Sequence, residues 1–159
     1  MVNSNSATEI PIACTPTVFS KAELAEHVSR GMDVLFRRPT RTAEHPEGFV
    51  FEYLGNEKLF LELARFAYNE HRCCPWVSFA IEMGPFVAET EGVLRLRYIG
   101  GERGKALLSE AFERLRVAAF DPEAERRLLH ALGALDTICH DNKDALYTDV
   151  AGPAAKSSA

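Results

Sequence analysis

Strand-like and helix-like segments alternate along the middle of this chain, and their order restricts the fold more than any other feature of the sequence. Apolar and polar side chains alternate with a period of two, typical of strands, in residues 49–54, 77–83 and 94–98. Apolar side chains recur every three or four residues, typical of amphipathic helices, in residues 57–72 and 107–115. The order over residues 48–117 is therefore strand, helix, strand, strand, helix. That order predicts an α+β fold, a two-layer sandwich with a ferredoxin-like antiparallel or mixed sheet and helices on one face.

The connections predict how the strands pair. A strand–helix–strand connection places the first two strands parallel, with a gap or a neighbour between them, and the 84–92 loop joins the second and third strands antiparallel. This pattern needs a fourth strand, and none follows residue 117. The short apolar stretch at residues 9–14 is expected to take the edge of the sheet and to end at Cys14. Residues 37–47, which include three arginines, are expected to form a polar loop.

Capping signals locate the helix ends. Ser20 and Glu23 have the spacing of a capping box, so a helix is expected to begin at Ser20 and to stop before Pro39. Asn56 is expected to cap the next helix. Asp121, followed by proline and glutamate, predicts the start of a last helix that carries a stripe of leucines. Such a stripe needs cover from its own domain or from a second copy, and we expect a homodimer formed through this C-terminal helix.

Length and charge limit the classes of protein that this chain can represent. Its 159 residues fit one domain with an appendage: we expect an α+β core domain at 9–118, a helical appendage at 119–151 and disordered tails at 1–8 and 152–159. The net charge of −5 argues against binding to nucleic acid, because no basic field is available for phosphate contacts. No apolar run is long enough for a membrane span and the first residues do not resemble an export signal, so a cytoplasmic protein without a membrane role is expected.

Cysteines are the residues in this chain most suited to chemistry. The chain contains Cys14, the adjacent pair Cys73 and Cys74, and Cys139. In a reducing cytosol a structural disulfide framework is not expected, and adjacent cysteines would close only into a strained ring that acts as a switch. As thiolates they favour soft ions such as Zn(II), Cu(I), Hg(II) or As(III).

A third sulfur would complete a trigonal site at the adjacent pair. Cys14 is the expected third ligand, because it would end a strand beside the strand that begins after Cys74. His71 is the expected fourth ligand, with Glu70 beside it, as in a zinc site with three sulfurs and one nitrogen. The leading hypothesis is a protein that binds a thiophilic metal or metalloid through this cysteine cluster, for sequestration, delivery or sensing.

Two other interpretations stay open. Cys73 or Cys74 could be the redox or nucleophilic residue of an enzyme, although the negative end of the preceding helix disfavours a thiolate there. Alternatively, the cysteines pack as small apolar side chains in a non-catalytic homo-oligomeric module. No catalytic residue is assigned by the sequence, which does not decide whether the chain is an enzyme. His27 is expected to be a partly buried, hydrogen-bonded histidine, and the glycine-rich run at 100–105 to be a strand-to-helix connection, since it lacks the spacing of a phosphate-binding loop.

Three segments resemble a group of small uncharacterised bacterial proteins. They are the run Ile12–Thr15, the strand Gly48–Phe51 and the run Glu70–Trp76 followed by Phe79. Members of the group carry A-C-[ST] near the N-terminus and a central E-x-x-C-C-P-aromatic-x-x-F motif. The resemblance covers residues 10–116, and it implies a bacterial source and a shared core without an established activity. Trp76 stands where phenylalanine is common in the group, and the helix after residue 121 lies outside the resemblance.

Overall fold

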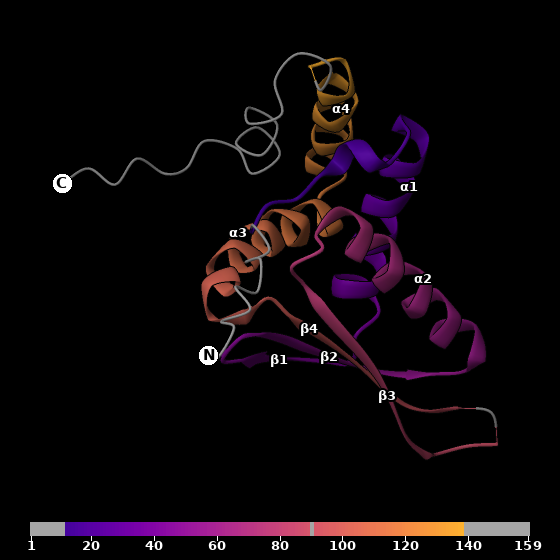
Figure 1. Cartoon of the computed structure of the whole chain (residues 1–159). Coiled ribbons are helices and arrows are strands. Elements are labelled where there is room, and N and C mark those ends of the chain that lie inside the picture. Colours follow the sequence, from indigo (N-terminus) through magenta and orange to yellow (C-terminus); the bar gives the residue numbers. More distant parts are fainter. Residues whose placement is uncertain (1–11, 90, 139–159) are drawn as a thin grey trace, which may run out of the picture.

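A four-stranded antiparallel sheet lies along one side of the molecule in the computed structural model, which describes residues 12–89 and 91–138 (Figure 1). Its strands are β1 (Arg41–His45), β2 (Gly48–Gly55), β3 (Ser78–Phe86) and β4 (Gly92–Ile99). Their order across the sheet is β1-β2-β4-β3, and each neighbouring pair is antiparallel. β2 and β3 therefore run parallel to each other with β4 between them, as the strand–helix–strand connection predicts. The α+β class is confirmed, whereas the ferredoxin-like assignment stays a prediction.

The strand at the β2 edge of the sheet is not the one that the sequence predicts. β1 lies in the segment expected to be a loop, and it pairs with β2 from Arg41 opposite Glu52 to His45 opposite Gly48. Its side chains are exposed or half-buried, so its sequence shows no apolar alternation. The prediction of a strand ending at Cys14 is wrong for residues 12–14, which are not in a strand, and residues 9–11 lie outside the described part of the chain.

Helices gather on one side of the sheet (Figure 1). They are α1 (Lys21–Met32), α2 (Glu57–Cys73), α3 (Gly101–Phe120) and α4 (Pro122–Ile138), with a 3-10 turn η1 (Pro16–Val18) before α1 and a π-helical turn η2 (Asp33–Arg37) after it. The predicted capping box is confirmed, because the Glu23 N–H donates to the Ser20 hydroxyl at 3.2 Å and the Ser20 N–H donates to the Glu23 carboxylate at 2.7 Å. Asn56 caps α2, and the Glu123 N–H donates to the Asp121 carboxylate at 2.9 Å where α4 begins.

The hydrophobic core lies between the sheet and the helices. The strands contribute their alternate buried side chains, which include Phe51, Tyr53, Leu94, Leu96 and Tyr98. The ring of Tyr98 meets Phe79 and Phe112 edge-on, with centroids 4.6 and 4.9 Å apart. Phe112 belongs to α3, so this aromatic group joins the third helix to the centre of the sheet. Tyr98 thus lies in the core while its hydroxyl reaches the site described below.

The last helix packs on its own chain. α4 contacts α1 and α3, and its residue Leu132 is only 4% exposed. Part of the predicted leucine stripe is therefore covered without a second copy.

The homodimer and the division into a core domain at 9–118 and an appendage at 119–151 stay predictions, and the tails expected at 1–8 and 152–159 lie outside the described residues. Within the described ranges, no helix is long and apolar enough to cross a membrane.

Candidate functional site

Three cysteines meet at the C-terminal end of α2. Cys73 is the last residue of that helix, Cys74 follows as its C-cap, and Cys14 precedes η1. Their three Sγ atoms all lie within 4.8 Å of one another. The structure thus brings together the three cysteines that the sequence names as ligands, although Cys14 reaches the pair from an irregular segment and not from a strand. Cys139 lies outside the described residues.

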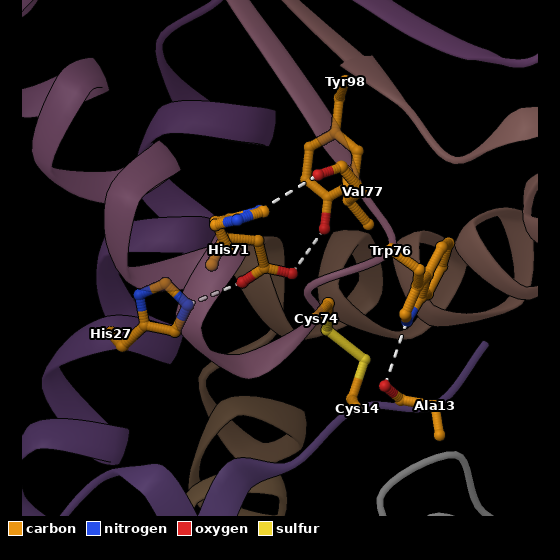
Figure 2. Close-up of a disulfide and its surroundings, with 9 residues drawn as sticks. Ala13, Cys14, His27, His71, Cys74, Trp76, Val77 and Tyr98 are labelled. Carbon is orange, nitrogen blue, oxygen red and sulfur yellow. Dashed lines mark hydrogen bonds and ion pairs between the residues drawn. A yellow bond between two sulfur atoms is a disulfide. The ribbon is translucent and has the colours of Figure 1, made fainter. Parts of the chain in front are cut away.

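A disulfide joins two members of this cluster, which differs from the expectation of reduced cysteines. Cys14 and Cys74 are bonded, with 4.5 Å between their Cα atoms (Figure 2). Cys73 remains a free, buried thiol. Partners 60 positions apart in the sequence are free to reach this ordinary Cα separation, whereas adjacent cysteines bond only by twisting the peptide between them. The strained ring between neighbours expected for an oxidised pair therefore does not form.

The N-terminal segment is also held against α2 by contacts other than the disulfide. The Thr15 N–H donates to the Cys73 carbonyl at 2.7 Å. The Trp76 indole N–H donates to the Ala13 carbonyl at 3.1 Å, as Figure 2 shows. Arg72 donates to the Val18 carbonyl at 3.1 Å. Since these contacts flank Cys14 on both sides, they are expected to keep its sulfur near the pair when the disulfide is reduced.

A carboxylate with two buried partners lies one helical turn before the cysteine pair. Glu70 accepts a hydrogen bond from the Tyr98 hydroxyl through Oε1, and its Oε2 lies 2.6 Å from Nε2 of His27 (Figure 2). The His27 ring lies between Phe19 and Phe66, at centroid distances of 5.1 and 5.4 Å, and its Nδ1 is buried without a hydrogen-bond partner. The prediction of a buried, hydrogen-bonded His27 is confirmed.

His71, the predicted fourth ligand, lies apart from this cluster. Its side chain is exposed and its Nδ1 lies 3.2 Å from the Val77 carbonyl (Figure 2). The group of potential ligand atoms within 4.8 Å of one another contains the three cysteines and not His71. Its role as a ligand stays a prediction.

Burial and charge keep the free thiol protonated. Burial, followed by the nearby negative charge of Glu70, raises the pKa of Cys73 from 9.0 to about 12, although a hydrogen bond from the Thr15 backbone lowers it. Burial and Glu70 also raise the pKa of Tyr98 well above its usual 10.0. Burial and a neighbouring carboxylate both raise the free energy needed to ionise these thiols. A bound cation would offset that free energy, because it attracts the thiolates.

A cavity of about 160 Å³ adjoins the cluster. All three cysteines line it, together with Glu70, His27 and several apolar side chains from the helices. The site therefore combines soft sulfur ligands, one hydrogen-bonded carboxylate and an apolar space.

Sequence reasoning missed Tyr98 as part of this site. Its place in the alternation of the third predicted strand indicates a core residue, which it is, with a relative exposure of 1%. Only the hydroxyl at the end of its ring serves the site, and nothing in the local sequence indicates that Glu70 lies within its reach. Comparison of the chain with family models, with curated proteins and with solved structures gives no match.

Proposed function

We propose that the reduced protein binds a thiophilic ion through Cys14, Cys73 and Cys74. The observation that carries this proposal is the separation of at most 4.8 Å among the three sulfurs. A metal–sulfur bond of about 2.3 Å, as for zinc, places sulfurs that share one ion about 4 Å apart. Once the disulfide is reduced, the Sγ atoms of Cys14 and Cys74 must move apart to this spacing, and all three sulfurs then surround one trigonal site.

Charge favours a trivalent metalloid among the candidate ions. Two of the cysteines are buried, and a buried site stabilises a complex without net charge better than a charged one. Three thiolates neutralise As(III), whereas the same thiolates leave a net negative charge around Zn(II), Hg(II) or Cu(I). Glu70 adds a further negative charge nearby. We therefore propose As(III), bound for sequestration, delivery or sensing in a soluble, cytoplasmic protein, as the ion that fits this site best.

Oxidation would control this binding. The bond between Cys14 and Cys74 removes two of the three ligands, so the oxidised protein would keep only the Cys73 thiol. Reduction by a small dithiol adds two electrons and two protons to the disulfide and restores both ligands, while the dithiol becomes the disulfide.

Native mass spectrometry of the reduced, desalted protein under anaerobic conditions tests the proposal. Titration with arsenite, Zn(II), Cu(I) and Hg(II) should show one arsenic atom per chain, with loss of three thiol protons. Single Cys14→Ser, Cys73→Ser and Cys74→Ser variants should bind arsenite much more weakly, and Cys139→Ser, the matched control, should bind it like the unmodified chain. Equal binding by all four variants, or none by the unmodified protein, would contradict the proposal.

A second candidate function is thiol–disulfide exchange by Cys14 and Cys74. The disulfide itself favours it, because Cys14 is only half-buried and a thiol partner could attack there. The raised pKa of Cys73 argues against that residue as the nucleophile. Cys73→Ser separates the two candidates: exchange with glutathione should persist in this variant, whereas arsenite binding should weaken. If the unmodified protein shows neither property, the cysteines are packing residues of a non-catalytic module.

A further inference from the structure

The cavity beside the cysteines has no role in holding a bare ion. Its apolar lining comes from three helices and includes Leu24, Val28, Leu108, Phe112, Leu115 and Leu128. An ion bound by three sulfurs needs only the space among them. A further 160 Å³ of largely apolar space therefore calls for a separate explanation.

The size and lining of the cavity fit a small hydrocarbon group. An apolar cavity of about 150 Å³ stays dry and accepts a benzene molecule. The cavity here has nearly that volume and an apolar lining, although it opens partly to solvent, and Cys73, a free cysteine, is among its lining residues. A ring inside the cavity would replace empty space with contacts to leucine and phenylalanine side chains.

We propose that the cavity receives the organic group of a trivalent organoarsenical, while cysteines of the cluster bind its arsenic atom. This inference rests on the proposed function and names its substrate class. Two thiols suffice for the reaction, because such an arsenical already carries one carbon–arsenic bond.

The binding step is a balanced exchange without a change in oxidation state. An arsine oxide loses its arsenic–oxygen bonds and forms two arsenic–sulfur bonds. Both thiol protons go to the departing oxygen, which leaves as water. The ligands are Cys73 and one of the two cysteines released when the disulfide is reduced.

Competition among three probes tests the inference: arsenite, methylarsine oxide and phenylarsine oxide, each added to the reduced full-length protein. Burial of the ring should make phenylarsine oxide bind about 10- to 100-fold more tightly than methylarsine oxide. A biphenyl arsine oxide, whose second ring exceeds the cavity volume, should bind no more tightly than phenylarsine oxide. Native mass spectrometry gives the relative affinities.

Cavity filling provides the matched variants. Ala111 lines the cavity from α3, so Ala111→Leu should reduce phenylarsine oxide affinity about tenfold or more and leave arsenite affinity unchanged. Ala106→Leu, at an exposed position of the same helix, should change neither affinity. If Ala111→Leu does not fold, the series of methyl, phenyl and biphenyl probes on the unmodified protein decides the question.

The outcomes separate the two proposals. Arsenite binding with equal affinity for the methyl and phenyl probes overturns the cavity inference and leaves the proposed function intact. Binding of neither arsenite nor any organoarsenical overturns both. A phenyl preference that Ala111→Leu abolishes and Ala106→Leu retains supports both.

Discussion

Cys73 links the stability of the fold to pH. Its pKa is raised from 9.0 to about 12 in the folded protein, first by burial and then by Glu70. The folded state therefore holds this proton more tightly than the unfolded chain, so the stabilisation is complete below pH 9 and is lost as the pH rises toward 12. We expect Cys73 alone to lower the free energy of unfolding of the oxidised protein by about 1 kcal/mol between pH 9 and pH 10.

Urea unfolding at a series of pH values measures this dependence. Cys73→Ala should make the fall between pH 9 and pH 10 about 1 kcal/mol smaller. The comparison stops at pH 10 because Tyr53 and Tyr98 also have raised pKa values, and their contribution to the same trend grows at higher pH. A profile with the same slope in the variant would contradict the assignment to Cys73.

The hydroxyl of Tyr98 satisfies a carboxylate that the fold partly buries. Tyr98→Phe keeps the ring against Phe79 and Phe112 and removes the donor to Oε1 of Glu70. We expect a loss of about 1–3 kcal/mol in the free energy of unfolding, because an acceptor is left without its partner. Tyr68→Phe is the control, since Tyr68 is 69% exposed. Equal urea midpoints for the two variants would show that the hydrogen bond does not stabilise the fold.

The candidate ligands could be predicted from the sequence, but most of their surroundings could not. An adjacent cysteine pair and a third cysteine indicate a thiol site by chemistry alone. The partners of Glu70 could not be predicted, because His27 and Tyr98 lie 43 and 28 positions away and meet it only after the helices pack on the sheet. The disulfide was missed because the expectation rested on the reducing environment and not on geometry.

At the scale of elements, the indole of Trp76 packs closely against the backbone where β4 ends and α3 begins. A Cβ atom on Gly104 would lie 2.5 Å from Cζ3 of the indole, and one on Gly100 would lie 2.8 Å from the same atom. Gly101 has a φ of +75°, a conformation that other residues rarely adopt. Gly100 and Gly104 thus allow the indole to approach α3 closely, whereas Gly101 allows the backbone conformation of the predicted strand-to-helix connection.

This close approach predicts a coupled pair of substitutions. Gly104→Ala should lower the free energy of unfolding by about 1–3 kcal/mol, because the ring must move to make space. In a Trp76→Leu background the same substitution should cost less, with a coupling of about 1 kcal/mol or more. Urea unfolding of the unmodified protein, the two single variants and the double variant measures this coupling. If Gly104→Ala lowers the free energy of unfolding equally with and without Trp76, a clash with the indole is ruled out.

Helices were easier to predict than the edge strand for a physical reason. Ser20, Asn56 and Asp121 satisfy helix N–H groups locally, so their signals lie within a few residues of the helix start. β1 has no comparable signal, because an edge strand with exposed side chains needs only backbone pairing with β2. Its backbone hydrogen bonds are made with a neighbouring strand, and they do not require any particular pattern of polar and apolar side chains in β1.

At the scale of the whole molecule, the disulfide connects the N-terminal segment to the far end of α2. It joins residues 60 positions apart, and a closed loop of that length stabilises a folded chain by about 4 kcal/mol through the entropy of the unfolded state. Reduction, or Cys14→Ser, should therefore lower the free energy of unfolding by up to about 4 kcal/mol. Cys139→Ser is the control and should leave it unchanged in urea unfolding without reductant.

Ion binding should return part of the stability that reduction removes. If the reduced cluster binds As(III) only when the chain is folded, arsenite at about 100 times its dissociation constant adds about 2.7 kcal/mol to the free energy of unfolding. The reduced protein should therefore unfold at a higher urea concentration with arsenite than without it, and Cys73→Ser should show a smaller shift. The oxidised protein should show no shift, because its disulfide occupies two ligands. A shift of equal size in the oxidised and reduced forms would place the ion away from these cysteines, and then the link between oxidation state, ion binding and stability would not hold.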